Sequence, residues 1–297
     1  MNIPTIQPKT LREILSDNTP PPEPIIDNGL LLDGTILLIV GPPKSKKTFF
    51  TQNLALSLAA GSEFAGFSVP KPRKVLYNIA EGGYYPNRDR IKTMAKNLHE
   101  NAYDNFMMST FSYLPLNEHD PYETMYGLIQ KTGAEVVIFD PLIKFHDVDE
   151  NTASQMSEVF GRLRKYIEKL HISIILIHHT GKVESKGGRG SNAIIGEYDS
   201  CVTLHKVNKL VTSLSYDMRH VESPPSNQIV FNSDTLWFES SSPLVDILKK
   251  SGGSMPKKDF IEEYGKSQAT TYRHIEKAVK TGSVTEEEDL LILTEPE

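Results

Sequence analysis

The sequence predicts an α/β fold in which helices flank a mostly parallel β-sheet, with a small C-terminal domain after it. Two observations favour this architecture. Short apolar runs typical of buried strands alternate with segments of helical periodicity over residues 25–240, whereas residues 243–297 show three short helical segments and a terminal strand. Hydrophobic residues make up 38% of the 297-residue chain, which is enough for a sizeable core.

The predicted elements follow one another in a regular order. Residues 1–24 form an N-terminal arm, because a short helical stretch at 11–15 is followed by the proline-rich linker 20–24. In the core, residues 25–240, the last two strands lack an intervening helix and are expected to form an antiparallel hairpin. The core strands are expected at 35–40, 75–80, 136–140, 172–177, 200–204, 210–217 and 228–238, and one helix at 49–60.

A phosphate-binding loop is the most specific motif. It lies between an expected strand and an expected helix, which is the context that such a loop requires. Its backbone N–H groups would face nucleotide phosphates, Lys47 would reach the β and γ oxygens, and the Thr48 hydroxyl would bind Mg²⁺. The alternative is a lysine-rich turn without a ligand. The predicted nucleotide-binding residues are Gly41, Pro42, Pro43, Lys44, Ser45, Lys46, Lys47 and Thr48.

Lys46 departs from the motif, which has glycine at this position. The position usually needs a positive φ, and a Cβ there costs roughly 1–2 kcal/mol in the left-handed conformation. The cations of Lys44 and Lys46 could offset this strain by attracting the triphosphate. Nucleotide binding is therefore expected, and slow hydrolysis is an open alternative.

Two strand ends are expected to add carboxylates to this site. Asp140 ends one expected strand, so its carboxylate lies at the carboxyl edge of the sheet, where Mg²⁺ must be held. Glu81 follows another strand and can accept a proton from the water that attacks the γ-phosphate. The alternatives are a turn that begins at Asp140 before a proline, and an acidic turn residue at Glu81 before two glycines.

His178 and His179 follow the strand at 172–177. Adjacent strand residues point to opposite faces, so the pair cannot readily chelate one metal, and no zinc site is expected. One of the two can instead sense the γ-phosphate. The glycine-rich loop after them is expected to contact a nucleic-acid backbone, with a solvated surface loop as the alternative. Its basic residues are Lys182, Lys186 and Arg189.

Composition narrows the function classes. The single cysteine, Cys201, excludes an internal disulfide framework and favours a reducing compartment. No apolar stretch reaches the ~18 residues that span a bilayer, and residues 1–10 lack signal-peptide features. We therefore expect a cytoplasmic protein without membrane contact. The net charge of −6 argues against a surface that coats nucleic acid everywhere, but it permits a local basic channel.

Taken in order, these motifs resemble the RecA-like P-loop ATPases of the RepA type, which are hexameric replicative helicases of plasmids and phages. The resemblance implies Glu81 as the catalytic glutamate, Asp140 as the aspartate on the Mg²⁺ side and His179 as the sensor beside the DNA loop. It also implies a homo-oligomeric ring that holds ATP between subunits and acts on single-stranded DNA. The resemblance covers residues 25–240 and rests on the segments at 33–35, 41–48, 77–83, 140–142, 178–182 and 189–191.

In that family a basic finger from the neighbouring subunit reaches the γ-phosphate, typically from a late Lys-x-Arg stretch. In the matching segment of this chain, Arg219 stands at the arginine position and Asp217 replaces the lysine. A finger supplies positive charge where negative charge develops in the transition state. The departure therefore predicts slower turnover with intact nucleotide binding.

Residues 243–297 resemble a winged helix-turn-helix. Ser267 is expected to cap the third helix, whose Arg273 and Lys277 could face a duplex groove. The unit carries eight Lys or Arg residues against eleven Asp or Glu residues, and its acidic run at 286–289 would repel phosphate. Duplex DNA and a partner protein therefore stay open as alternative ligands of this unit.

The sequence thus predicts a ring-forming ATPase that acts on DNA, a helicase or helicase-like motor of a plasmid, phage or other mobile element. Two alternatives stay open. Lys46, Asp217 and the acidic C-terminal unit favour a slow or inactive nucleotide switch that recruits other proteins. A recombinase-type filament former is the second alternative, although a filament does not need a C-terminal winged helix.

Overall fold

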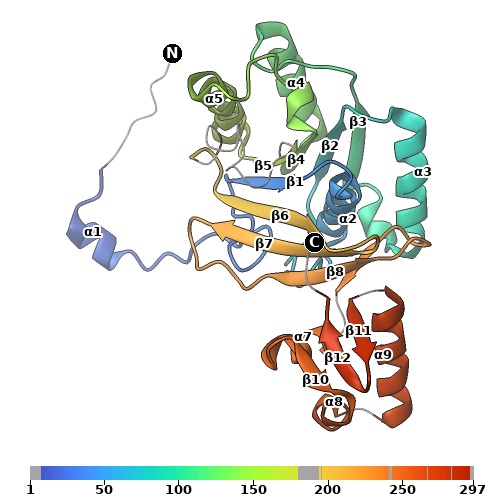
Figure 1. The fold of residues 1–297 in the computed structure, drawn as a ribbon. Coiled ribbons are helices and arrows are strands. Elements are labelled where there is room, and N and C mark those ends of the chain that lie inside the picture. Colours follow the sequence, from blue (N-terminus) through green and yellow to red (C-terminus); the bar gives the residue numbers. More distant parts are fainter. Residues whose placement is uncertain are drawn as a thin grey trace.

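A nine-stranded sheet forms the centre of the main domain in the computed structural model, which describes residues 8–179, 194, 196–240, 243–265, 267–281 and 283–294. The strands are β1 (Ile36–Gly41), β2 (Val75–Ile79), β3 (Phe106–Thr110), β4 (Val136–Asp140), β5 (Ser173–His179), β6 (Ser200–Lys206), β7 (Val211–Met218), β8 (Asn227–Phe231) and β9 (Phe238–Ser240). Their order in the sheet is β3-β2-β4-β5-β1-β6-β7-β8-β9 (Figure 1). The first six strands in this order run parallel to one another. β7, β8 and β9 continue the sheet as antiparallel strands, and the arrangement confirms the predicted fold class.

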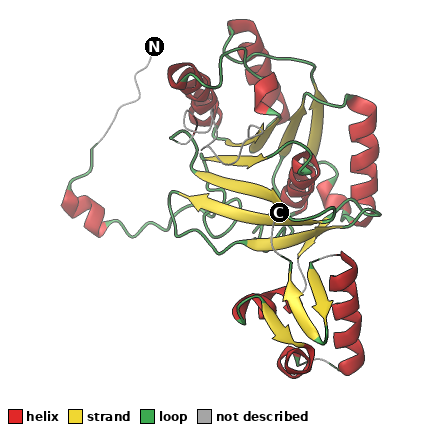
Figure 2. Cartoon of the chain, viewed as in Figure 1, coloured by secondary structure: helices red, strands yellow, loops and turns green. Residues whose placement is uncertain are grey.

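Helices on both faces explain why the central strands are apolar along their whole length (Figure 2). Alternate residues of β1 enter opposite cores: Leu37 packs with α2, and Leu38 packs with α4 and α5. Every residue of β1, β2 and β4 is buried. The main-domain helices are α2 (Lys47–Ala60), α3 (Tyr84–Met94), α4 (His119–Thr132) and α5 (Ala153–Leu170).

Two parts of the sheet differ from the sequence expectation. β3 was not expected, because its residues are only partly buried and form no continuous apolar run. The segment at 228–238, expected as one strand, forms β8 and β9 with a turn between them. In that turn the Asn232 side-chain oxygen accepts hydrogen bonds from the backbone N–H groups of Asp234 (3.0 Å) and Thr235 (3.2 Å). The expected hairpin is therefore a longer antiparallel extension.

The helix of the N-terminal arm lies apart from the main domain (Figure 1). Its helix α1 (Leu11–Ser16) begins with a capping box between Thr10 and Glu13, and no residue of the helix is buried. Within the described residues, no helix is long and apolar enough to cross a membrane.

The C-terminal residues form a second sheet with a hydrophobic cluster of its own, which includes Leu244, Phe260 and Leu291. Three helices and a terminal strand appear where the sequence analysis expected them, together with two short strands that it did not. The Ser267 hydroxyl accepts a hydrogen bond from the Thr270 N–H at the start of the third helix (3.4 Å). The elements are α7 (Pro243–Lys250), β10 (Ser254–Pro256), α8 (Lys257–Tyr264), α9 (Gln268–Thr281), β11 (Val284–Glu287) and β12 (Leu290–Leu293), and the strand order is β10-β12-β11.

Candidate functional site

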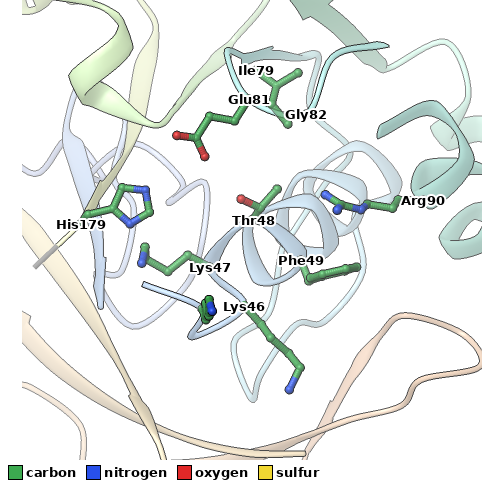
Figure 3. Close-up of a pocket in the computed structure, with 10 residues that line it drawn as sticks. Lys46, Lys47, Thr48, Phe49, Ile79, Glu81, Gly82, Arg90 and His179 are labelled. Carbon is green, nitrogen blue, oxygen red and sulfur yellow. The ribbon is translucent and has the colours of Figure 1, made fainter. Parts of the chain in front are cut away.

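The predicted site residues meet at the carboxyl edge of the parallel strands. β1 ends at Gly41 beside His179, the last residue of β5, and β2 ends at Ile79 beside Asp140, the last residue of β4. Parallel strands that end together form one edge, where ligands of open α/β sheets bind. A cavity opens here (Figure 3), lined by Lys44, Lys46, Lys47, Thr48, Phe49, Ile79, Glu81, Gly82, Arg90 and His179.

The loop between β1 and α2 has the close contacts of a phosphate-binding loop. A Cβ on Gly41 would lie 2.8 Å from the Leu204 carbonyl oxygen and 2.9 Å from the Ser45 hydroxyl oxygen, so the strand can pass β6 here only as glycine. The Ser45 hydroxyl is buried and has no hydrogen-bond partner among the described residues. Such an unsatisfied group and the free N-terminus of α2 are donors that fit a phosphate.

Lys47, the first residue of α2, is buried and points toward His179 in the cavity (Figure 3). Its ammonium donates hydrogen bonds to the carbonyl oxygens of Gly41 (2.7 Å) and Pro42 (2.8 Å). Burial lowers the pKa of Lys47 to about 8, although the Asp140 and Glu81 carboxylates act in the opposite direction. Bound phosphate would replace the two carbonyl oxygens with stronger, charged acceptors.

Lys46 adopts the left-handed backbone conformation that the motif predicts, with φ 62° and ψ 26°. Its side chain does not run beside Lys47. The ammonium instead donates a hydrogen bond to the Lys209 carbonyl oxygen in the turn between β6 and β7, and it lies 5.0 Å from the centre of the Phe231 ring. Burial, with Lys206 and Lys209 nearby, lowers the pKa of Lys46. Lys46 lines the cavity, and its attraction of the triphosphate stays a prediction beside this contact with Lys209 and Phe231.

Asp140 is buried at the end of β4 and accepts a hydrogen bond from the Tyr77 hydroxyl (2.5 Å). The Thr48 hydroxyl also hydrogen-bonds its carboxylate. Burial raises the pKa of Asp140 to about 6, against the effect of these two hydrogen bonds. A carboxylate beside a hydroxyl is a set of hard oxygen ligands that fits Mg²⁺. Tyr77 was not predicted, because a tyrosine inside an apolar strand is typical of a core residue.

Glu81 lies two residues beyond β2, with its carboxylate exposed in the cavity (Figure 3). The turn that carries it is fixed by Asn87, whose buried side-chain N–H groups donate to the carbonyl oxygens of Glu81 (3.0 Å) and Gly83 (2.7 Å). A β-sheet edge and an anchored turn thus place a free carboxylate opposite Lys47 and Thr48. This is the position that a base needs if a water is to attack the end of a triphosphate.

His179 completes the cavity from β5. Burial lowers the pKa of His179, as do the charges of Lys47 and His178, while Glu81 and Glu150 act to raise it. Its imidazole can donate a hydrogen bond from a ring N–H to a phosphate oxygen.

Arg90 lines the same cavity from α3 and was not predicted as a site residue. Its guanidinium lies 4.8 Å from the centre of the Phe49 ring and donates a hydrogen bond to the Asn87 side-chain oxygen (3.4 Å). An arginine on a polar helix is usually a solvated residue, so the sequence pattern alone did not mark Arg90 as part of the site.

Arg219, Arg273 and Lys277 do not line this cavity. Arg219 follows β7 at the opposite edge of the sheet, because Met218 pairs with Ser200 at the start of β6. Its guanidinium donates to the Gly196 carbonyl oxygen (2.9 Å) and lies 3.6 Å from the Asp199 carboxylate. Arg273 and Lys277 lie in α9 of the C-terminal unit. Lys182, Lys186 and Arg189 lie outside the described residues.

The fold and this cavity define a RecA-like P-loop ATPase. The chain belongs to a family of AAA domains, AAA_25, whose model matches residues 4–185.

Solved structures share the fold at low sequence identity. One solved ATPase domain is 14% identical, with a TM-score of 0.55 over 71% of this chain and 86% of that chain. The RadB recombinase is 18% identical, with a TM-score of 0.51 over 71% and 92% of the two chains. A DnaB-like replicative helicase, solved in a study of its interactions with primase, is 13% identical, with a TM-score of 0.53 over 69% and 57%. This chain thus spans little more than half of that helicase.

Proposed function

We propose that this protein is an ATP-binding and ATP-hydrolysing motor that assembles into a hexameric ring and acts on single-stranded DNA. Its place would be that of a replicative helicase or helicase-like ATPase of a plasmid, phage or other mobile element. The observation that carries this proposal is the meeting of Lys47, Thr48, Glu81 and His179 around one cavity at the carboxyl edge of a RecA-like sheet. Asp140 ends β4 at the same edge, beside Ile79. The structural likeness to a solved ATPase domain and to a DnaB-like replicative helicase supports it.

Each residue has a role that its position suits. Lys47 exchanges the Gly41 and Pro42 carbonyl oxygens for the β and γ phosphate oxygens of ATP. Thr48 and Asp140 would hold Mg²⁺, and the bound ion would neutralise charge on the phosphates. Glu81 accepts the proton of the attacking water, and His179 contacts the γ-phosphate, so that its position depends on whether that group is present.

Arg219 supports a site shared between subunits. It lies at the sheet edge opposite its own phosphate-binding loop, so it cannot reach a nucleotide bound there. In a ring, Arg219 of one subunit could instead reach the nucleotide bound by the neighbouring subunit, as an arginine finger. Asp217, which stands where the family has lysine, accepts a hydrogen bond from the Tyr198 hydroxyl (2.8 Å) and would not add positive charge.

We assign residues 1–24 to an arm, 25–240 to the ATPase domain and 243–297 to a winged-helix-like domain. Lys182, Lys186 and Arg189 are proposed to contact single-stranded DNA. Arg273 and Lys277 of α9 are proposed to contact duplex DNA, with a partner protein as the other ligand of this domain.

A nucleotide switch that recruits another protein is the second candidate. The observation that favours it lies in the C-terminal unit, where the Lys257 ammonium is held by Glu286 (2.6 Å) and lies 5.0 Å from the Tyr272 ring centre. A lysine neutralised in this way offers less charge to DNA phosphates.

Negative-stain electron microscopy with ATP and single-stranded DNA, combined with a hydrolysis assay, separates the candidates. Closed rings with DNA-stimulated hydrolysis are expected for the motor. Monomers that bind ATP without turnover would favour the switch, and open helical assemblies would favour a filament.

A further inference from the structure

A buried cluster of three titratable side chains lies behind the candidate site and has no part in the roles assigned above. The Glu150 carboxylate oxygen Oε1 lies 3.4 Å from His178 Nδ1 and 3.5 Å from His146 Nε2. The two imidazoles are 8% and 1% exposed, and the Glu150 side chain is 22% exposed. These distances allow electrostatic attraction, while the directions of the groups do not make hydrogen bonds of good geometry.

The Glu150 carboxylate stays ionised in this cluster. Burial acts to raise the pKa of Glu150, but the contacts with His146 and His178 outweigh it, and the pKa falls to about 2. A carboxylate that stays ionised in a largely buried position needs polar partners beside it, here the ring nitrogens of the two imidazoles. No group of three His, Cys, Asp or Glu residues in the described part of the chain is placed to hold a metal ion. The cluster is a contact between one carboxylate and two imidazoles.

The cluster joins two segments that carry residues of the candidate site. His146 and Glu150 lie between β4, which ends at Asp140, and α5. His178 lies in β5 next to His179. Because neighbouring strand residues point to opposite faces, Glu150 holds β5 from the side opposite the cavity that His179 enters.

His179 needs such support, because its own side chain is not held. Its Nδ1 is buried and makes no hydrogen bond with any described residue. Its direction then depends on the backbone at the end of β5. The charges of the cluster also reach it, since His178 acts to lower the pKa of His179 and Glu150 acts to raise it. Burial and Lys47 act to lower that pKa, and Glu81 acts to raise it.

We propose that Glu150, with His146 and His178, positions His179: it anchors the end of β5 to the segment after β4 and so fixes how the imidazole enters the nucleotide cavity. These are positioning residues and do not touch the nucleotide. The inference rests on the proposed function in one respect, the role of His179 during ATP hydrolysis.

A double-mutant cycle tests the link to His179. Glu150→Gln keeps the size of the side chain and removes its charge. It should lower kcat about tenfold, because small misplacements of a catalytic group have effects of this order, while the Kd for ADP by calorimetry stays within about twofold. In a His179→Ala background, Glu150→Gln should lower kcat by less than about twofold, since the positioned group is already gone. An equal loss of kcat in both backgrounds would overturn the proposal.

Glu158→Gln is the matched control. Glu158 lies in α5, is 63% exposed, pairs with Arg162 at 3.7 Å and takes no part in the cluster. Its loss should leave kcat unchanged. If Glu150→Gln does not fold, His146→Gln removes one imidazole and enters the same cycle.

Amide hydrogen exchange gives a readout that does not depend on activity. Glu150→Gln should speed exchange at residues 177–179 relative to Glu158→Gln, because the end of β5 loses its anchor. Unchanged exchange there would overturn the anchoring, whatever the kinetics show. A wild-type protein that hydrolyses no ATP, but whose Glu150→Gln variant exchanges faster, would refute the proposed function and leave the anchoring standing.

Discussion

Replacement of Lys46 by glycine restores the residue that the phosphate-binding loop usually has, and the structure predicts two opposing effects. The change relieves the left-handed backbone strain, and it removes the contacts of the ammonium with the Lys209 carbonyl oxygen and the Phe231 ring. Lys46→Met separates the two, because methionine keeps the strain and loses the ammonium.

The free energies of these effects predict that the glycine variant is more stable than the methionine variant. The lost hydrogen bond is worth about 1 kcal/mol, and the cation–π contact about 0.5 kcal/mol at a partly exposed site. Lys46→Met should therefore lower the free energy of unfolding by about 1.5 kcal/mol. Glycine regains about 1.5 kcal/mol of strain and loses about 0.7 kcal/mol to the greater freedom of the unfolded chain. Lys46→Gly should thus be about 0.8 kcal/mol more stable than Lys46→Met.

Urea denaturation of the two variants and the wild type measures these differences. With the phosphate-binding geometry no longer strained, Lys46→Gly should also hydrolyse ATP faster than the wild type with a similar Kd. A glycine variant that is less stable than the methionine variant would refute the strain argument. A fall in turnover with weaker binding would show that Lys46 is a phosphate ligand.

Three further predictions concern the site and its sharing between subunits. Lys47→Ala should abolish ATP binding, and an unchanged Kd by calorimetry would reject the assignment of the loop. Burial lowers the pKa of Lys47 to about 8, and phosphate binding requires the charged form of the lysine. The affinity for ATP should therefore fall as the pH rises through about 8. A constant affinity from pH 7 to 10 would contradict this prediction. Arg219→Ala and Glu81→Gln should each be inactive, yet a mixture should regain partial activity, because some interfaces then combine an intact Glu81 with an intact Arg219. If subunits exchange and no activity returns, the finger in trans is wrong.

The parallel part of the sheet could be predicted because its strands are buried on both faces and therefore apolar along their length. β1, β2, β4 and β5 all lie within two residues of the predicted bounds. β3 has no such signal, since an edge strand is buried on fewer sides. The last expected strand is interrupted by a turn in which the Asn232 side-chain oxygen accepts two backbone hydrogen bonds. Such a turn depends on hydrogen bonds that the pattern of apolar residues does not reveal.

The candidate site could be predicted where the chemistry lies at strand ends. Parallel strands place Gly41, Asp140 and His179 at one edge without any knowledge of packing. Contacts between distant segments could not be predicted. The Lys46 ammonium meets a carbonyl oxygen 163 positions away, and the Tyr77 hydroxyl meets a carboxylate 63 positions away.

Glu81→Gln is the sharpest test of the proposal that ATP is hydrolysed in this cavity with Glu81 as the base. ATP affinity by calorimetry should match the wild type within about twofold, because glutamine keeps the shape of a side chain that lies opposite the phosphates. The hydrolysis rate should fall at least about 100-fold, which is the contribution expected of a general base. A Glu81→Gln variant that hydrolyses ATP as fast as the wild type and the Glu158→Gln control would rule out Glu81 as the base.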